Sequence, residues 1–190
     1  MEEYFKNLKE KEKGNLVLKK GRWWNGNTYM PFYEYTLNYK YKDSEIIFNY
    51  EYRQSEFTKP SMIDGGALGD RHICQVSCEV RPKKDSCNFK ITERGFLGRI
   101  LRSTKGDLFK VKCENVEMKE FLLKNQSLYY LYSIVENSPE FSPEILGVKK
   151  DKLDEKYFQL KIRYNTQQEN KSILFHINEF CKEVSTFWDN

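Results

Sequence analysis

The chain has 190 residues, of which 39% are hydrophobic, 15% aromatic and 32% charged. No stretch approaches the roughly 20 apolar residues of a membrane-spanning helix, and the first thirteen residues lack the apolar core of a signal peptide. The composition also argues against general disorder. We therefore expect a soluble, cytoplasmic protein with no transmembrane segment, folded as a single domain over residues 1–190.

The formal net charge of +4 is unevenly distributed. Residues 81–113 contain ten basic and three acidic residues, whereas the two flanking segments are balanced or slightly acidic. The five cysteines are an odd number in a chain large enough to need no disulfides, so we expect reduced thiols. The many Lys, Asn, Tyr and Ile residues suggest a bacterial origin.

The first elements in chain order are a helix and a turn-rich segment. Residues 2–13 predict a short N-terminal helix that ends near Gly14. Residues 21–27 are rich in turn-forming residues and include Trp23 and Trp24. The sequence does not tell whether these two tryptophans are exposed.

Residues 33–53 have the clearest pattern of the chain, a β-hairpin with apolar and polar residues in alternation. One face would carry the larger apolar residues, namely Tyr33, Tyr35, Leu37, Tyr39, Tyr41, Ile46, Phe48, Tyr50 and Tyr52. Period-two alternation places these side chains on one side of a sheet. We therefore expect an antiparallel sheet that is covered on one side and faces water on the other.

The next segments predict further strands. Residues 58–70 form a loop rich in Gly, and residues 71–81 alternate as a strand. A turn follows at 82–85, and residues 87–91 predict the hairpin partner of the preceding strand. Residues 96–101 predict a short amphipathic helix.

The second half is expected to be mainly helical. Residues 109–113 predict a strand, 116–137 one or two helices, 138–156 mostly loop, 158–164 a last strand, and 172–188 an amphipathic helix.

We therefore expect an α+β fold, with an antiparallel sheet of about six strands packed against late helices, including a long amphipathic C-terminal helix. Within the single domain, residues 1–14 form an N-terminal helix, 15–113 are mainly β, and 114–190 are mainly α with one further strand.

A zinc site is one chemical hypothesis, since His72, Cys74, Cys78 and Cys87 are of the ligand types that zinc prefers. The first three would follow one strand face, where alternate residues are about 6.5 Å apart, which is wide for direct co-ligation. The chain has no Cys-x-x-Cys. Buried cysteines facing a core account for the same pattern, so we expect neither a metal nor an organic cofactor.

Residues 64–72 are the most enzyme-like stretch. Asp64, Asp70, Arg71 and His72 beside flexible backbone are suited to acid–base chemistry or anion binding. However, the stretch lacks the Lys-Ser/Thr ending of a phosphate loop, and glycines in a connection between strands serve the backbone alone. We keep a hydrolase-like site here as an alternative.

The basic segment favours an anionic partner. Its residues are Arg81, Lys83, Lys84, Lys90, Arg94, Arg99, Arg102, Lys105, Lys110 and Lys112. Trp23 and Trp24 beside Arg22 would supply stacking rings if the partner were a nucleic acid. An ordinary solvated surface accounts for the same pattern. The candidate binding residues are Arg94, Arg99, Arg102, Lys105, Trp23 and Trp24.

The second half resembles a group of uncharacterised bacterial proteins. In that group an aromatic-x-Ile strand leads to a Gly-Asp-x-Phe strand, a Leu-rich helix and an amphipathic C-terminal helix. The matching segments are residues 89–91, 106–109, 121–123 and the helix that ends near Trp188. The resemblance implies an α+β fold and brings no activity or catalytic residue.

The absence of a clear catalytic cluster favours a non-enzymatic binding or regulatory role through protein contacts, as in an immunity or accessory protein. A basic segment suits an acidic protein partner. Two alternatives stay open: a module that binds nucleic acid or an anionic surface through residues 81–113, and an enzyme with its site at 64–72.

Overall fold

The structure is a computed structural model and describes residues 1–24, 26, 28–54, 70–93, 108–137, 141–152 and 155–189. These residues form one antiparallel sheet of eight strands and four helices. The strand order across the sheet is β1-β2-β3-β4-β8-β7-β5-β6. The α+β class is therefore confirmed, whereas the expected number of about six strands was too low.

The strands are β1 (Asn15–Trp24), β2 (Tyr29–Tyr41), β3 (Ser44–Arg53), β4 (Arg71–Val80), β5 (Phe89–Glu93), β6 (Phe109–Cys113), β7 (Glu144–Lys152) and β8 (Glu155–Thr166). The helices are α1 (Glu2–Glu12), α3 (Val116–Lys124), α4 (Gln126–Asn137) and α5 (Lys171–Asp189).

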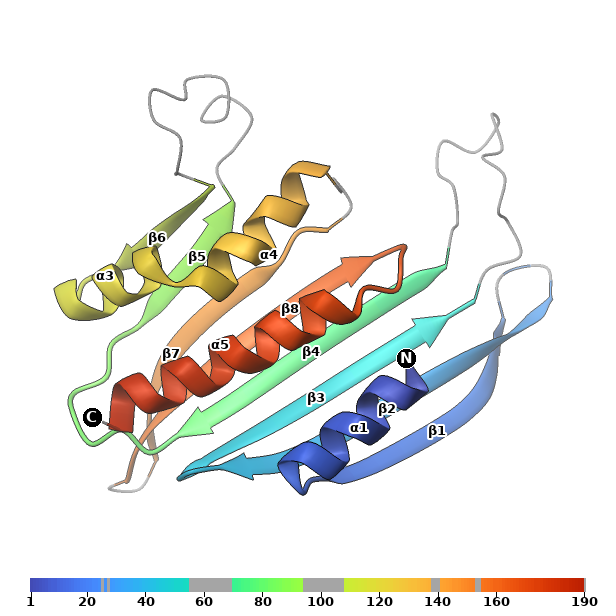
Figure 1. Cartoon of the computed structure of the whole chain (residues 1–190), viewed down its shortest axis with the longest axis horizontal. Helices are drawn as coiled ribbons and strands as arrows, with labels where there is room; N and C mark the ends of the chain where they lie inside the picture. The colour runs from blue at the N-terminus through green and yellow to red at the C-terminus, as the bar shows by residue number, and fades with distance from the viewer. Residues whose placement is uncertain are drawn as a thin grey trace.

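All four helices lie on the same face of the sheet (Figure 1). Phe5 of α1 stacks on Tyr35 of β2, with ring centroids 5.2 Å apart. Trp188 near the end of α5 packs against Phe158 of β8 at the same centroid distance. Because aromatic rings bury a large apolar area, these contacts stabilise the packing of α1 and α5 on the covered face of the sheet.

The predicted hairpin is confirmed as β2 and β3, which are joined through the pair Tyr41 and Ser44. Lys42 in the turn has a left-handed backbone, with φ of 53°. The large apolar side chains do face the helices, because Tyr35, Leu37 and Phe48 are at most 5% exposed. The alternation therefore marks the buried side of the sheet as expected.

The predicted helical region 116–137 forms two helices, each of which begins at an asparagine cap. The Asn115 Oδ1 atom accepts a hydrogen bond from the Met118 amide at 2.8 Å, at the start of α3. Asn125 accepts one from the Leu128 amide at 3.0 Å, at the start of α4. Each side chain satisfies a backbone donor that the first turn of a helix leaves free.

Three strand predictions were wrong. Residues 21–24 continue β1 instead of forming a turn, and β7 occupies residues 144–152 of the segment 138–156, which was expected to be mostly loop. β5 pairs with β6 and β7, whereas the neighbour of β4 is β8. β1 is an edge strand and buries little, so its apolar alternation is weak. Residues 58–69 of the predicted loop at 58–70, and the whole predicted helix at 96–101, lie outside the described residues.

Candidate functional site

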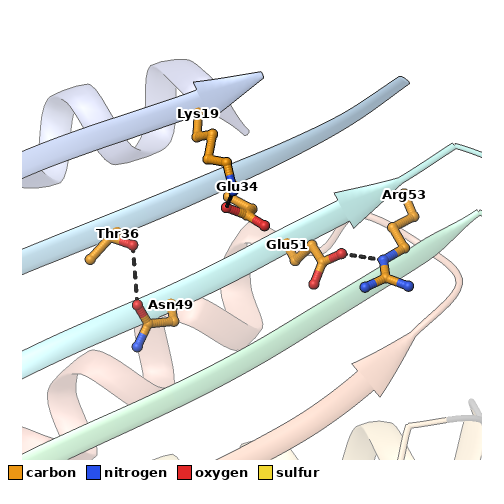
Figure 2. Close-up of polar contacts among 6 residues, drawn as sticks. All are labelled: Lys19, Glu34, Thr36, Asn49, Glu51 and Arg53. Carbon is orange, nitrogen blue, oxygen red and sulfur yellow. Dashed lines mark hydrogen bonds and ion pairs between the residues drawn. The ribbon is translucent and has the colours of Figure 1, made fainter. Parts of the chain in front are cut away.

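The face of the sheet turned away from the helices is the candidate site, and we call it the open face. Along each central strand, buried side chains on the helix side alternate with more exposed ones on the open face. In Figure 2 the helices pass behind the strands, and the six labelled side chains lie in front of them. The open face is therefore available for contact over the described residues.

A row of polar residues crosses the middle of the open face. Thr36, Asn49, Gln75, Arg163 and Glu144 are successive cross-strand partners on β2, β3, β4, β8 and β7. The Thr36 hydroxyl donates to the Asn49 carbonyl oxygen at 3.1 Å (Figure 2). Neighbouring side chains in such a row are close enough to act on a single ligand.

Two depressions lie on this row, with volumes of about 280 and 240 Å³. The larger is lined by residues of β3, β4, β7 and β8, and the smaller by residues of β2, β3 and β4. Asn49 and Gln75 line both depressions, so the two lie side by side. Their side-chain amides offer both hydrogen-bond donors and acceptors to a ligand. We call the two depressions together the open-face groove.

On the β1–β4 half of the open face, charged side chains neutralise one another. Lys19 Nζ lies 3.0 Å from Glu34 Oε2, and Arg53 pairs with Glu51 (Figure 2). The other charged side chains on this half are two of each sign, namely Lys40, Arg71, Glu45 and Glu79. This half therefore presents little net charge.

The β5–β8 half carries an excess of basic side chains. These open-face cations are Lys90, Lys110, Lys112, Lys150, Lys161 and Arg163. Lys90 Nζ lies 3.9 Å from a Glu144 carboxylate oxygen. The other five cations form no ion pair with another described residue. Lys161 and Arg163 line the open-face groove directly.

The predicted basic segment is divided in the structure. Lys83 and Lys84 follow β4 and contact the C-terminal end of α5. Lys83 forms an ion pair with Asp189 at 2.8 Å, and the Lys84 ammonium lies over the ring of Phe187. The segment's strand lysines, at positions 90, 110 and 112, lie on the open face instead. Arg94, Arg99, Arg102 and Lys105 lie outside the described residues, so their predicted role in binding stays a prediction.

The two predicted tryptophans point to opposite sides of β1. Trp23 is half-buried, its indole N–H donates to the Gln54 carbonyl at 3.2 Å, and the Arg53 guanidinium lies over its ring. Trp24 is 54% exposed and contacts Tyr29. β1 is at one edge of the sheet and β6 at the other, so the tryptophans are remote from the lysines of β5 and β6.

The predicted enzyme-like residues do not all come together. Arg71 is exposed on the open face, whereas the next residue, His72, is buried on the covered face. The Tyr52 hydroxyl donates to Asp70 Oδ2 at 2.8 Å and its ring stacks on His72. Burial lowers the pKa of His72, which favours the neutral imidazole. Asp64 lies outside the described residues.

The residues weighed as zinc ligands also separate. His72, Cys74 and Cys78 are buried along β4, and Cys87 instead contacts Cys113, with the sulfur atoms 3.4 Å apart. Across the described ranges, no group of three or more His, Cys, Asp or Glu side chains is placed to hold a metal ion.

Sequence reasoning missed the contribution of the second half of the chain to the open face. Lys150, Lys161 and Arg163 belong to a segment whose overall composition is slightly acidic. A signal was present in β8, where Lys161 and Arg163 alternate with Leu160, Ile162 and Tyr164. That alternation places the two cations on the polar side of a strand but does not reveal which strands lie beside it.

Comparisons of the chain with protein-family models, with curated proteins and with solved structures gave no match. Among the described residues, no helix combines the length and the apolar character that crossing a membrane requires.

Proposed function

We propose that the chain is a non-enzymatic binding protein that holds an acidic protein partner against the open face of its sheet. The observation that carries this proposal is the set of open-face cations, five of which have no ion pair among the described residues. Side chains anchored on a hydrogen-bonded sheet are presented in a defined spacing, and positive charge in that spacing complements carboxylates on a partner.

The arrangement of Lys90 and Lys112 supports this role. They are direct cross-strand partners on β5 and β6, and like charges in that position destabilise a sheet. Leu146 of β7 is the cross-strand partner of Lys90 on one side and of Lys161 of β8 on the other. Lys161 therefore lies in the same row of the sheet as Lys90, two strands away from it. A carboxylate of the partner would reduce the repulsion between the Lys90 and Lys112 ammonium groups. Binding would therefore offset the destabilisation that this pair causes in the free protein.

The open-face groove supplies the remaining contacts of a protein interface. Asn49 and Gln75 offer hydrogen bonds at its centre. Leu146 and Ile73 line its two parts and are half-buried apolar side chains that a partner would cover. A mixture of apolar area, amides and charge is typical of interfaces between proteins that also exist separately.

A role of this kind fits an immunity-like or accessory protein, which regulates a partner by occupying its surface. The proposal includes a bacterial source, which the composition and the resemblance of the second half imply, and a location in the cytoplasm.

Nucleic acid is the main alternative occupant, because phosphates also recognise the open-face cations. Single-stranded nucleic acid further requires rings on which bases stack. Trp23 and Trp24 are on the opposite edge strand of the sheet from Lys110 and Lys112, so these two rings lie far from those cations. An acidic protein is therefore the better match.

The test compares two charge-reversal variants that change the net charge equally. The first is Lys161→Glu with Arg163→Glu on the open face, and the control is Lys9→Glu with Lys119→Glu on exposed positions of α1 and α3. Binding to poly-L-glutamate and to a single-stranded oligonucleotide is measured by fluorescence anisotropy. We expect the wild type and the control to bind poly-L-glutamate more tightly than the oligonucleotide. The open-face variant should lose on the order of tenfold in affinity.

Capture from a bacterial lysate with quantitative mass spectrometry extends the test to natural partners. Acidic proteins should be enriched by the wild type and the control and lost from the open-face variant. Equal loss in both variants would show that only net charge matters and would contradict the proposal. Tighter binding of the oligonucleotide, weakened by the same two open-face substitutions, would favour the nucleic-acid alternative.

A further inference from the structure

The five cysteines fall into two groups. Cys74, Cys78 and Cys181 are fully buried in the core between the sheet and α5. Cys87 and Cys113 are only partly buried, and their sulfur atoms are 3.4 Å apart. No other pair of cysteine sulfurs combines such a contact with exposure in the described residues.

The position of this pair allows it to close. Cys113 is the last residue of β6 and pairs in register with Phe89 of β5, two residues after Cys87. A disulfide requires a sulfur separation of about 2.05 Å, so the two atoms must approach by a little more than 1 Å. Cys87 precedes the strand, and its backbone is therefore not held by the hydrogen-bond ladder of the sheet.

The pair is accessible from a depression of about 640 Å³ that both cysteines line. Lys90, Lys112 and Lys149 line the same depression, against the one carboxylate of Glu114. The local charge is therefore positive, which attracts small anions. Glutathione disulfide is an anion of suitable size that carries an exchangeable sulfur–sulfur bond.

We propose that Cys87 and Cys113 form a dithiol site that small disulfides of the glutathione class oxidise to an intramolecular disulfide. One thiol of the pair loses its proton and attacks a sulfur of the oxidant, which expels one glutathione thiolate and leaves a mixed disulfide. The second thiol then displaces the other glutathione. The cysteine pair gives up two electrons and two protons, and two glutathione thiols are released.

The new bond would restrain the edge of the sheet. β5 is joined to β7 through only three register pairs, at Phe89, Lys90 and Ile91, and β6 is the edge strand. A bond from Cys87 to Cys113 ties the chain before β5 to the end of β6. It also restrains the Cys113 sulfur, which contacts the backbone carbonyl of Asn115, the residue that caps α3.

The exchange is expected to be slow at neutral pH. Burial and the neighbouring Cys113 thiol raise the pKa of Cys87 to about 12. Since the thiolate is the attacking species, the rate should increase as the pH is raised.

The experiment incubates the folded chain of 190 residues with oxidised glutathione at about pH 8.5, where a larger fraction of thiol is ionised. Free thiols are then counted after denaturation, and peptides are mapped by mass spectrometry. We expect three of the five thiols to remain, a mass lower by two hydrogens, a Cys87–Cys113 peptide pair, and full recovery with dithiothreitol.

Variants separate this site from the buried cysteines. Cys87→Ser and Cys113→Ser should each abolish the intramolecular bond, whereas Cys78→Ala should retain it. Five remaining thiols in the wild type, a stable glutathione adduct on one cysteine, an intermolecular dimer, or a disulfide mapped to another pair would each overturn the proposal. The wild-type peptide map decides the matter even if a variant fails to fold, and it does not depend on the proposed partner.

Discussion

The Tyr50 hydroxyl lies 2.5 Å from Nδ1 of His72, in the buried layer between the sheet and the helices. Burial raises the pKa of Tyr50 above its ordinary value, so the phenol keeps its proton. A neutral imidazole completes this hydrogen bond either as an acceptor or as a donor at Nδ1, according to its tautomer. Burial lowers the pKa of His72 and so holds the imidazole in its neutral form.

The neutral state of His72 predicts a loss of stability in mild acid. The pKa of His72 is lowered in the folded chain, so the unfolded chain takes up a proton at a higher pH than the folded one. The free energy of unfolding should therefore decrease as the pH falls below about 6.5, the ordinary value for histidine. Urea unfolding measured between about pH 7 and pH 5 should show this decrease. His72→Gln should reduce the slope of the free energy of unfolding against pH by at most the contribution of one bound proton.

His176 provides an internal comparison, because burial lowers its pKa as well. His176→Gln should reduce the slope in the same direction, and the double variant should have the flattest profile in this range. Carboxylates such as Asp189, whose pKa is lowered by Lys83, act at a lower pH, near or below about 4. An unchanged slope in the double variant would contradict the assignment to the histidines.

Gly147 of β7 should not tolerate even a methyl group. A Cβ atom there would lie 2.6 Å from Cζ of Phe158 and would also overlap the ring of Phe89, and both rings are buried. Gly147→Ala should therefore cost about 1–3 kcal/mol in the free energy of unfolding, measured by urea denaturation, because a packed core cannot yield.

Gly21 of β1 is the matched control for this prediction. A Cβ at that position would lie 2.6 Å from Cζ of Phe32, a comparable overlap. Phe32 is only partly buried and lies on the open face, so its ring can turn towards solvent. Gly21→Ala should cost no more than about 0.5 kcal/mol. Equal costs at the two glycines would show that the buried rings adapt as freely as the exposed one.

The ion pair between Glu12 and Lys182 should contribute more stability than any pair on the open face. The two side chains connect α1 to α5 at 2.6 Å and are only 10% and 12% exposed. Glu12→Gln would leave the Lys182 ammonium with Glu179 at 3.7 Å as its remaining partner. We expect a loss of about 1–3 kcal/mol in the free energy of unfolding, measured by urea denaturation at neutral pH.

The pair of Lys19 and Glu34 is the exposed counterpart, with side chains 66% and 40% exposed. Glu34→Gln removes the same charge, yet solvent screens that pair, and the loss should not exceed about 0.5 kcal/mol. Similar losses in the two variants would mean that burial does not strengthen the contact between α1 and α5.

Local patterns predicted the elements whose burial is strongly one-sided. The hairpin of β2 and β3 and the C-terminal helix α5 were expected from their periodicity, because each buries one regular set of side chains. β1 and β7 were missed for the same physical reason. β1 is at an edge and buries little, and β7 combines Gly147 with lysines that obscure the alternation.

The candidate site was less predictable than the fold. Lys90, Lys110 and Lys112 were recognised as part of a basic segment, but Lys161 and Arg163 were not connected with them. The connection arises because β8 and β7 lie between β4 and β5 in the sheet, although both come later in the chain. Counting charges along the sequence does not reveal the order of the strands in the sheet.

The amino-acid sequence by itself determined that the chain forms an antiparallel sheet with one aromatic, helix-covered face, because alternation between neighbours is a local property of each strand. Only the tertiary structure decided which cations share the open face and that the sulfurs of Cys87 and Cys113 touch. Those relationships depend on the pairing of segments far apart in the chain, which is chosen by the packing of the whole core rather than by any one stretch of residues.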